Sequence, residues 1–410
     1  MRTVDDDELA RRLAAFPAPD PRIVAGGNFA TPWHLLEIAE RALPAYRLFV
    51  LNAQQGVPDR EGVTLETPFV GPGMRGRERL AYLPMRLSLV PSFLTGAGVP
   101  DAVLVQTSPP RGGRVSLGIE VNVLPAAVES ARRHGGLVVA QVNRYMPYTL
   151  GDAELDEDDI DLAVEHDVRI PSPPPASGDE TSAQIGERVA VLVEDGATLQ
   201  IGIGGVPDAT LTYLGGRREL RVWSEMVSDG VLGLERAGAL DQGREIVASF
   251  LFGSEELYRW ADRNERLRLA RTETTNDPVR IARNGRMLSL NSALQVDLFA
   301  QANASWVRGR VYSGFGGQSD FIVGALHSAG GHAIIALPSW HPRANCSSIV
   351  PLLDAPVTSF QHSAIVTEQG SAFLFGRSQR EQARAIVASA AHPRARPELE
   401  DAIGRHGLAR

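Results

Sequence analysis

Short apolar runs alternate with amphipathic stretches of helical period along most of this 410-residue chain. Alternation of this kind favours an α/β fold with a largely parallel sheet, because parallel strands need a helical crossover between them. The expected strands lie within 22–27, 101–106, 136–142 and 198–203, and the expected helices within 32–43, 123–133, 183–194 and 207–214.

The expected linker is 170–180, since its three consecutive prolines fit neither a helix interior nor a central strand. It follows an acidic stretch, 152–167, that we expect to form a solvated helix face and a turn rather than a metal site. Strand, glycines, proline and helix follow in the same order at 22–39 and at 198–214. We therefore predict two similarly built open α/β domains with mostly parallel sheets, 1–175 and 176–410.

The charge balance argues against nucleic acid or an anionic membrane as a partner. The net charge is −8, and the basic residues are scattered rather than gathered into a stripe. The chain has no lysine, which excludes a Schiff-base lysine, a pyridoxal-phosphate anchor and a Walker A lysine. The acidic, amphipathic start is not a secretory signal, and no apolar run is long enough to span a bilayer. These features predict a cytoplasmic enzyme.

Metal and hydrolase signatures are missing. Cys346 is the single cysteine, which excludes an intramolecular disulfide and a multi-cysteine metal site, and we expect a packed thiol. The nine histidines are dispersed, without H-E-x-x-H or paired spacing, so no metal site is expected. His341 and His362 are weak candidates for lining a site. No G-x-S-x-G elbow is present, so a Ser-His-Asp hydrolase lacks its signature.

The glycine-rich stretch 202–206 is the strongest local motif. Gly202, Gly204 and Gly205 lie between an expected strand and a helix that Pro207 is expected to open. Glycines let the backbone approach a ligand closely, and a helix N-terminus presents N–H groups to an anion. The ligand is then a phosphate or the oxyanion of an acyl transfer; a tight turn without a ligand is the alternative.

A second glycine-rich turn, 313–321, follows the β-like sequence Arg-Val-Tyr-Ser. Gly314, Gly316 and Gly317 again suggest close approach to a ligand, with an ordinary loop as the alternative. Neither turn is a dinucleotide fingerprint, because the last glycine of G-x-G-x-x-G is replaced by Pro207 and by Ser319. An NAD-binding dehydrogenase is therefore disfavoured.

Glu225 follows a short apolar run and precedes an Asp-Gly turn signal. This order predicts a carboxylate at the carboxyl end of a strand, the edge of an open α/β sheet where ligands bind. If this strand lies beside the strand that ends at Gly202, Glu225 faces the glycine N–H groups. That arrangement pairs a nucleophile with an oxyanion hole.

Seven ordered motifs resemble the acetyl-CoA hydrolase/transferase family, and within it the 4-hydroxybutyrate and butyrate CoA-transferases. The most specific pair is the glycine motif and the Ser-Glu-Met-Val-Ser-Asp-Gly motif around Glu225, at this spacing. The motifs span nearly the whole chain, at 106–118, 140–152, 201–209, 224–230, 292–304, 313–325 and 365–370. The resemblance implies two α/β domains of CoA-transferase type.

The resemblance also implies ping-pong chemistry on acyl-CoA, with coenzyme A as substrate and neither metal nor NAD. Glu225 would attack the thioester, CoA thiolate would open the mixed anhydride, and an incoming carboxylate would take over the CoA from a glutamyl-CoA thioester. The oxyanion and CoA-binding residues would be Gly202, Ile203, Gly204, Gly205 and Val206. Further CoA-binding residues would be Ser313, Gly314, Gly316 and Gly317, and the substrate pocket would contain Asn143, Met146, Tyr148 and Leu150.

Several positions depart from the family pattern and suggest a changed, less polar acyl or acceptor pocket. They are Arg111, Arg114, Tyr148, Leu150, Ala300, Gln369 and Phe375. A thioesterase on the same scaffold, acyl transfer with a carrier-protein thioester and a non-catalytic CoA-binding protein are the alternatives. The resemblance also implies a homo-oligomer, a dimer or a tetramer; the donor, the acceptor and the pathway stay open.

Overall fold

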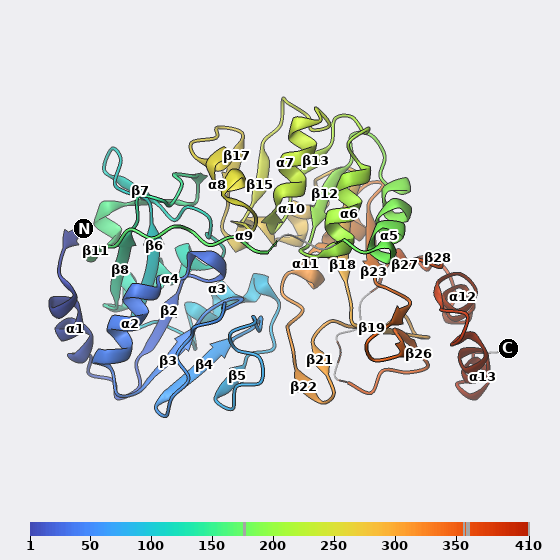
Figure 1. Ribbon diagram of the computed structural model, residues 1–410, viewed down its shortest axis with the longest axis horizontal. Helices are drawn as coiled ribbons and strands as arrows, with labels where there is room; N and C mark the ends of the chain where they lie inside the picture. Colours follow the sequence, from blue (N-terminus) through green and yellow to red (C-terminus); the bar gives the residue numbers. More distant parts are fainter. Residues whose placement is uncertain (175–177, 356, 358–360, 409–410) are drawn as a thin grey trace. The chain divides into compact units, whose positions relative to one another are not determined.

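The structure is a computed structural model that describes residues 1–174, 178–355, 357 and 361–408. It divides into two compact units, coloured along the chain in Figure 1. The first comprises Met1–Pro173, Ile246–Thr275 and Val311–Gly316, and the second Pro174–Glu245, Asn276–Arg310 and Gly317–Arg410. The predicted boundary at 175/176, and residues 175–177 of the predicted linker, lie outside the described residues, so the boundary stays a prediction.

An eight-stranded sheet forms the centre of the first unit, in the order β1-β11-β8-β6-β2-β3-β4-β5. All neighbouring strands are parallel, as the alternating pattern predicts. The strands are β1 Arg2–Thr3, β2 Arg22–Ala25, β3 Tyr46–Phe49, β4 Val63–Thr67, β5 Leu80–Tyr82, β6 Ala102–Thr107, β8 Leu137–Val142 and β11 Leu162–Glu165. The first unit's helices are α1 Asp6–Ala14, α2 Trp33–Ala42, α3 Val90–Leu94, α4 Leu124–His134, α8 Glu255–Ala261 and α9 Thr272–Thr275.

Strands β6 and β8 lie in the buried interior of this sheet. Every residue of both strands is buried, as expected for parallel strands that are covered on both faces. Helix α4 packs on both of them and ends at Gly135, whose φ of 77° is the left-handed conformation that favours glycine. The later segments of the first unit add β15 Ile246–Ala248, β16 Phe250–Leu251 and β17 Leu267–Leu269, and β17 pairs in parallel with β9 Leu150–Gly151.

The acidic stretch 152–167 differs from its prediction as a helix face. It forms β10 Glu154–Asp156, a 3-10 turn at Glu157–Asp159, and β11. Strand β10 pairs antiparallel with β7 Arg114–Ser116, and β11 is buried in the sheet except for Glu165. The apolar residues Leu162 to Val164 outweigh the acids around them, because their burial in the sheet removes apolar surface from water.

One ion pair is buried in the first unit. Arg22 on β2 donates from Nε to Glu66 Oε2 at 2.8 Å and from Nη2 to Oε1 at 3.2 Å. The two side chains are only 13% and 7% exposed, so both charges are largely shielded from water. Breaking such a pair leaves one buried charge uncompensated, which is more costly than removing both.

We therefore predict that Glu66→Ala lowers the free energy of unfolding by about 3 to 5 kcal/mol, measured by urea denaturation of tryptophan fluorescence. The matched control is Asp20→Ala, which breaks the ion pair to Arg47, with side chains 48% and 44% exposed. An exposed pair contributes about 1 kcal/mol at most. Equal losses in the two variants would contradict the assignment of Glu66 as the buried partner.

A six-stranded sheet forms the centre of the second unit, in the order β13-β12-β18-β23-β27-β28. Its neighbours are parallel except β28, which turns back antiparallel on β27. The strands are β12 Thr198–Ile201, β13 Arg221–Val222, β18 Met287–Ser292, β23 His332–Ala336, β27 Ala364–Thr367 and β28 Gly370–Phe373. The shorter strands include β14 Met226–Val227, β19 Gln295–Asp297, β20 Ala302–Asn303, β21 Trp306–Val307, β24 Trp340–His341, β25 Cys346–Ser347 and β26 Ile349–Val350.

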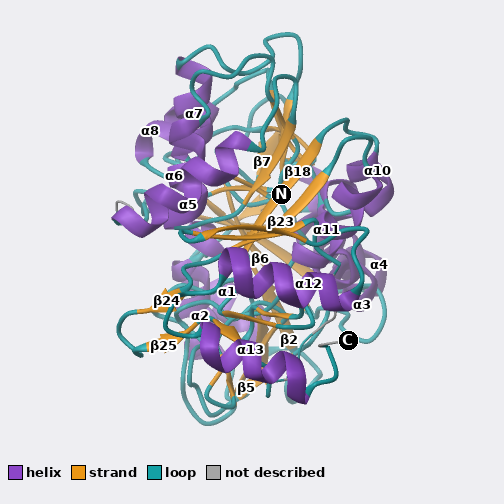
Figure 2. Ribbon diagram, turned by 90° about the vertical axis from the view of Figure 1, so that its right-hand side faces the viewer, coloured by secondary structure: helices purple, strands orange, loops and turns teal. Residues whose placement is uncertain are grey.

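Helices cover both faces of the second unit's sheet, as Figure 2 shows for β18 and β23 between α5 and α6 on one side and α10 and α11 on the other. Two mostly parallel sheets, one in each unit, confirm the predicted α/β class. The helices are α5 Glu180–Val191, α6 Gly205–Tyr213, α7 Asp229–Arg236, α10 Pro278–Ala282, α11 Gln318–His327, α12 Gln379–Ala385 and α13 Arg396–Arg405.

Ala300, one of the positions at which the sequence departs from the pattern of the resembled family, has a φ of 59°. Left-handed backbone costs a non-glycine residue about 1 to 2 kcal/mol. The turn is held because the Asp297 carboxylate accepts hydrogen bonds from the backbone N–H groups of Phe299 and Gln301, both at 2.9 Å. The alanine is therefore tolerated in a conformation that favours glycine.

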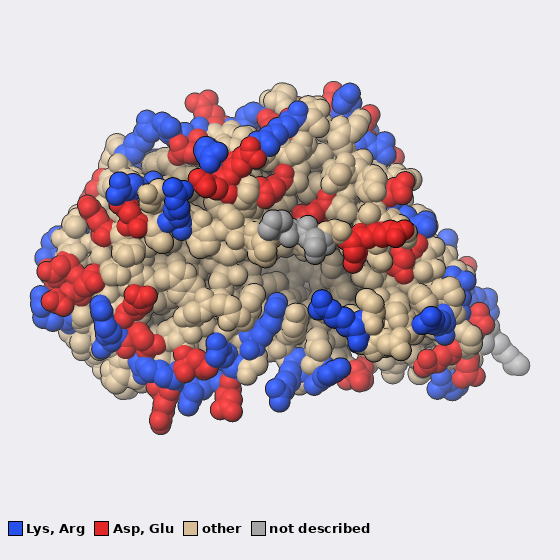
Figure 3. Space-filling view, viewed as in Figure 1, with Lys and Arg blue, Asp and Glu red and all other residues tan. Residues whose placement is uncertain are grey.

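The described surface carries both signs of charge. Arginine and acidic side chains are interspersed over the face seen in Figure 3, in agreement with their scatter along the sequence. None of the helices within the described ranges is long and apolar enough to cross a membrane.

Candidate active site

Glu225 lies at the carboxyl edge of the second unit's sheet. Strand β13 pairs in parallel with β12, with Leu199 opposite Val222, so the condition that these strands are neighbours is met. Beyond the strand, Trp223 N donates to Leu199 O at 3.1 Å and Ser224 Oγ to Ile201 O at 3.4 Å. These bonds keep the chain extended up to Glu225, at the edge where β12 gives way to the first glycine turn.

The Asp-Gly signal after Glu225 does not form the predicted loop turn. Asp229 and Gly230 are instead the first residues of helix α7, after the N-cap Ser228. A Cβ added at Gly230 would overlap Leu211 of α6, so the glycine permits the close packing of these two helices. An acidic residue in the first turn of a helix is favourable, because it faces the positive end of the helix dipole.

Asn276 holds the Glu225 carboxylate: its Nδ2 donates to Glu225 Oε2 at 3.2 Å. The backbone of Gly317 lies beside the same carboxylate, and its N–H lowers the pKa of Glu225. Gly317 is the N-cap of α11, so the carboxylate lies at the positive end of a helix dipole. A Cβ at Gly317 would overlap both Glu225 Oε2 and Asn276 Nδ2, so only glycine admits this arrangement.

The pKa of Glu225 is raised from 4.5 to about 7. Burial is the largest cause, because it disfavours the charged form, and the neighbouring charge of Asp320 raises the pKa further. The hydrogen bonds from Asn276 and Gly317 act in the opposite direction. Asp320 is buried in the first turn of α11. The result is a carboxylate that is more basic than usual and still ionises near neutral pH.

The first glycine turn consists of Gly202, Ile203 and Gly204, which follow β12, and of Gly205 and Val206, which begin α6. Gly204 has a φ of 128°, which only glycine adopts readily. Helix α6 begins at Gly205 and not at Pro207, which was predicted to open it; Pro207 fits because the first helical turn needs no intrahelical N–H donor. The hydrogen bond found for Glu225 comes from Asn276, not from this turn, so oxyanion donation by the turn stays a prediction.

The first turn of α6 also contains a second perturbed acid. Burial raises the pKa of Asp208 to about 6, and the charge of Asp229 at the start of α7 raises it further. Both acids lie in the first turns of neighbouring helices. Carboxylates so close to the glycine turn add negative charge there, so an anionic ligand must be bound by donors other than their side chains.

The second glycine turn is divided between the two units. Gly317 contacts Glu225, whereas Ser313, Gly314 and Gly316 belong to the first unit. Val70 N donates to Ser313 O at 3.3 Å, and Leu87 N to Gly316 O at 2.9 Å. Gly316 has a φ of 50°, and a Cβ at Gly314 would overlap Pro68 O, so both glycines are required by the backbone. The β-like sequence before the turn becomes a short strand, β22 Arg310–Val311.

The four predicted substrate-pocket residues lie in the first unit. Asn143 is fully buried; it donates to Gln106 Oε1 at 2.6 Å and Val168 O at 2.7 Å. Met146 is buried against Gly118, where a Cβ would overlap its sulfur. The structure therefore gives both residues protein partners, and their place in a substrate pocket stays a prediction.

Tyr148 and Leu150 are half-buried. Tyr148 Oη donates to Glu154 Oε1 at 2.9 Å, and burial together with this carboxylate raises the pKa of Tyr148 to about 12. Leu150 lies in β9 beside β17. Of the other departures, Phe375 is 68% exposed, and Gln369 Nε2 donates to Glu368 at 3.2 Å.

The predicted packed thiol is wrong: Cys346 is exposed, on the short strand β25. It lies opposite His341 in the antiparallel pair of β24 and β25, where too little chain surrounds it to bury it. His362 is 2% exposed, and burial lowers its pKa to about 4, so it is neutral at pH 7. The described residues contain no group of three or more His, Cys, Asp or Glu side chains placed to hold a metal ion.

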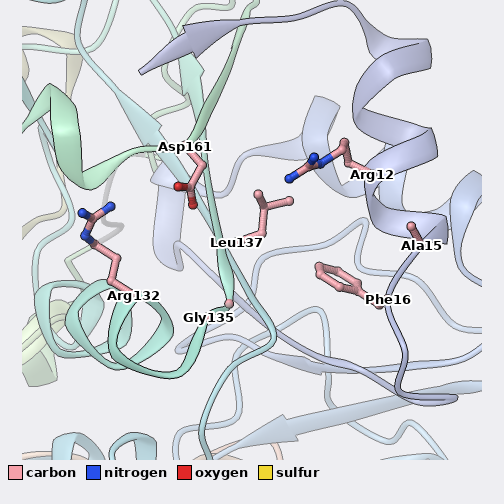
Figure 4. A pocket seen from close by; sticks show the side chains of 8 residues that line it. Arg12, Ala15, Phe16, Arg132, Gly135, Leu137 and Asp161 are labelled. Carbon is pink, nitrogen blue, oxygen red and sulfur yellow. The ribbon is translucent and has the colours of Figure 1, made fainter.

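A pocket of about 600 Å³ lies in the first unit where α1 and α4 end (Figure 4). Arg12 and Arg132 line it, and their charges complement the negative ends of the two helix dipoles. Leu137, the first residue of β8, places the pocket at the amino edge of the sheet. Ligands of open α/β sheets bind at the opposite edge, and none of the predicted site residues lines this pocket.

Sequence reasoning missed Asn276. Its one local signal is the Asn-Asp-Pro start of α10, where Asp277 accepts a hydrogen bond from Val279 N at 2.9 Å. That signal predicts a helix cap and carries no information on Glu225, which is distant in the sequence.

Comparison with known proteins gives consistent matches. The model of the acetyl-CoA hydrolase/transferase C-terminal domain matches residues 253–403. The 4-hydroxybutyrate coenzyme A transferase of Clostridium kluyveri is 41% identical over 335 residues, 78% of this chain and 76% of that protein. The crystal structure of RipA from Yersinia pestis is similar with a TM-score of 0.91 at 28% identity, over 99% of this chain and 98% of that one. A 4-hydroxybutyrate CoA-transferase from Porphyromonas gingivalis gives 0.81 at 30% identity, with the same coverage.

Proposed function

The chain belongs to the acetyl-CoA hydrolase/transferase family, and we propose that it moves CoA from an acyl-CoA to a carboxylic acid by ping-pong chemistry on Glu225. That the enzyme acts on CoA thioesters, by transfer or hydrolysis, follows from the family. The observation that carries the finer proposal is the Glu225 carboxylate, which accepts a hydrogen bond from Asn276 and lies beside Gly317 at the N-terminus of α11, with a pKa near neutrality.

In the first step, the Glu225 carboxylate attacks the thioester carbonyl, the carbon–sulfur bond breaks and CoA leaves as a thiolate. The product is a mixed anhydride between Glu225 and the acyl group. Negative charge develops on the substrate oxygen, and the N–H groups of the turn from Gly202 to Val206 are the proposed donors to it. Carboxylates are weak nucleophiles in water, and the partial burial of Glu225 strengthens this one.

In the second step, CoA thiolate attacks the Glu225 carbonyl carbon and expels the acyl group as a carboxylate. Negative charge now develops on a Glu225 oxygen, where Asn276 Nδ2 already donates and beside which the Gly317 N–H lies. These groups are in place before the reaction, so they cost no reorganisation when the charge forms. The resulting glutamyl-CoA thioester passes its CoA to an incoming carboxylate by the same two steps in reverse.

Hydrolysis is the second candidate, because the family includes both activities. The two differ in whether water or a carboxylate takes the acyl or CoA group from Glu225. We propose transfer as the main reaction. Measuring products from an acyl-CoA with and without added carboxylates separates them: transfer predicts that CoA moves to the added acid and forms its acyl-CoA, whereas release of free CoA that ignores the acid supports hydrolysis. Acyl transfer with a carrier-protein thioester predicts activity with that thioester instead.

The pH dependence follows from the Glu225 pKa. Only the ionised carboxylate attacks, so we predict that kcat/KM falls about tenfold per unit as pH drops below about 7. Acceptor acids of ordinary pKa stay ionised across pH 5.5 to 8, so this limb reports on the enzyme. Initial rates at fixed ionic strength measure it. An acid limb of kcat/KM with an apparent pKa near 4.5, the ordinary value for glutamate, would contradict the raised pKa of Glu225.

We further propose a cytoplasmic homo-oligomer, a dimer or a tetramer, with acyl-CoA and a carboxylic acid as its partners. The resemblance to the acetyl-CoA hydrolase/transferase family supports this proposal. Size-exclusion chromatography with light scattering tests it directly, and a monomer at micromolar concentration would contradict it.

A further inference from the structure

An aromatic ring and a guanidinium group are stacked beside the second glycine turn, within the first unit. The Cζ of Arg75 lies 4.0 Å from the ring centroid of Tyr312, a close cation–π contact. Arg75 Nε also donates to Tyr312 O at 2.9 Å. Two independent interactions therefore fix the guanidinium over one face of the ring.

The pair is held next to residues that are predicted to bind CoA. Tyr312 directly precedes Ser313, whose carbonyl accepts from Val70 N at 3.3 Å. At Gly314 the backbone approaches Pro68 O so closely that a Cβ would overlap it. The segment from Pro68 to Arg75 therefore runs along the glycine turn, and it presents Arg75 and Tyr312 together.

Both side chains face solvent. Tyr312 is 42% exposed and Arg75 is exposed, although burying an aromatic ring is normally favourable. Within the described part of the chain, no carboxylate pairs with Arg75. Arg77 of the same loop differs, because it forms an ion pair with Asp59 at 2.5 Å. Arg75 therefore keeps an uncompensated charge and unused N–H donors beside an exposed ring.

Such a surface fits a phosphorylated aromatic ligand. A nucleobase stacks on an exposed tyrosine face, and a guanidinium donates to phosphate oxygens in a geometry that an ammonium group lacks. The chain has no lysine, so an arginine is the only fixed cation that it can offer a phosphate. The acids near the first glycine turn, Asp208 and Asp229, cannot take this role.

We infer that Arg75 and Tyr312 form a subsite for the nucleotide end of CoA, with the adenine on the exposed face of Tyr312 and a phosphate on Arg75. This inference rests on the proposed CoA chemistry and deepens it. Because the nucleotide is remote from the thioester, its binding energy helps to hold the reacting group without taking part in the bonds that change.

Steady-state kinetics with an acyl-CoA and with the matching acyl-pantetheine, which lacks the nucleotide, test the subsite. Arg75→Ala and Tyr312→Leu are each expected to raise KM for the acyl-CoA about tenfold with little change in kcat. Neither variant is expected to change the kinetics of the acyl-pantetheine. Tyr312→Phe keeps the ring and should match the wild type. Arg12→Ala, in the last turn of α1, is a further control and should also match the wild type.

Direct binding supplies a readout that does not depend on turnover. Calorimetry with 3′-phospho-ADP, the nucleotide fragment of CoA, should show about tenfold weaker binding in Arg75→Ala and in Tyr312→Leu. A structural role would impair acyl-pantetheine turnover as much as acyl-CoA turnover, and that outcome overturns the inference. Unchanged KM and unchanged nucleotide binding overturn it as well. Activity that survives in Glu225→Gln would refute the proposed covalent mechanism and not the subsite. Nucleotide binding does not depend on that mechanism, so the two failures can be told apart.

Discussion

Glu225→Gln is expected to lower kcat/KM for CoA transfer by a factor on the order of 10⁴ or more. The amide cannot attack a thioester carbonyl as a carboxylate does, so the covalent route is lost. Removing the nucleophile of a covalent mechanism typically costs on the order of 10⁶ in kcat. The loss is measured as the rate at which a labelled carboxylate is converted to its labelled acyl-CoA by CoA from an unlabelled acyl-CoA. The matched control is Glu194→Gln, an exposed acid of the second unit, which should keep wild-type activity.

The same variant should be at least as stable as the wild type at pH 8, which separates lost chemistry from lost folding. The folded-state pKa of Glu225 is raised, so its favourable contribution to the free energy of unfolding is complete below about pH 4.5. That contribution is lost as the pH rises to about 7. Above that pH the wild type holds a desolvated charge that glutamine lacks. A Glu225→Gln protein that melts well below the wild type at pH 8 would mean that its inactivity reflects unfolding.

Asn276→Ala is expected to lower kcat by about 10² to 10³-fold, the typical effect of removing one oxyanion donor. The Asn276 amide donates to the Glu225 oxygen that becomes negative when CoA thiolate attacks the anhydride. Because this step forms the CoA adduct, pre-steady-state adduct formation should slow as much as turnover does. Asn276→Asp keeps the size but replaces the donor with a negative charge, and it should be at least as damaging.

The pH profile of Asn276→Ala distinguishes a donor to Glu225 from a purely structural residue. The Asn276 hydrogen bond lowers the pKa of Glu225, so removing it should move the acid limb of kcat/KM to higher pH. Asn284→Ala is a control, since its amide donates only to the backbone of α10, to Arg280 O at 3.1 Å and Ile281 O at 3.2 Å. Full activity with an unchanged limb would remove Asn276 from the site.

The sequence predicts most of the fold because its signals are local. The buried apolar runs of β6 and β8, and helix α4 between them in the chain, follow directly from the sequence pattern. Pairing of β12 with β13 was anticipated as a condition for the site, and the register of Leu199 with Val222 confirms it. The acidic stretch 152–167 forms strands rather than the predicted helix face, because the burial of Leu162 and Val164 outweighs the charges around them.

The site was only partly predictable, since its contacts are made across long sequence distances. Glu225 and Gly317 were candidates from their motifs, and the structure places them side by side, so that a Cβ at Gly317 would overlap Glu225 Oε2. Asn276 had no signal of its own. The chain also returns to the first unit at 246–275 and at 311–316, which a single linker near residue 175 does not foresee. Nothing local in the sequence marks where such a return begins.

Tyr148 and Leu150 are where substrate preference should be sought. Tyr148 binds Glu154 through its hydroxyl and Leu150 lies in β9, so both side chains have structural partners as well as a predicted place in the pocket. A screen of acyl-CoA donors against carboxylate acceptors, in the wild type and in Tyr148→Phe, would show whether this hydroxyl affects the choice of acid.

The most direct test of the account is the covalent intermediate itself. Incubating the protein with an acyl-CoA and no acceptor should convert part of it to a species heavier by one CoA less one water, seen by intact mass. Borohydride should then reduce the adduct, and peptide mapping should place the change on Glu225. No adduct on Glu225 across a broad panel of acyl-CoA donors, or an adduct on another residue, would contradict the mechanism.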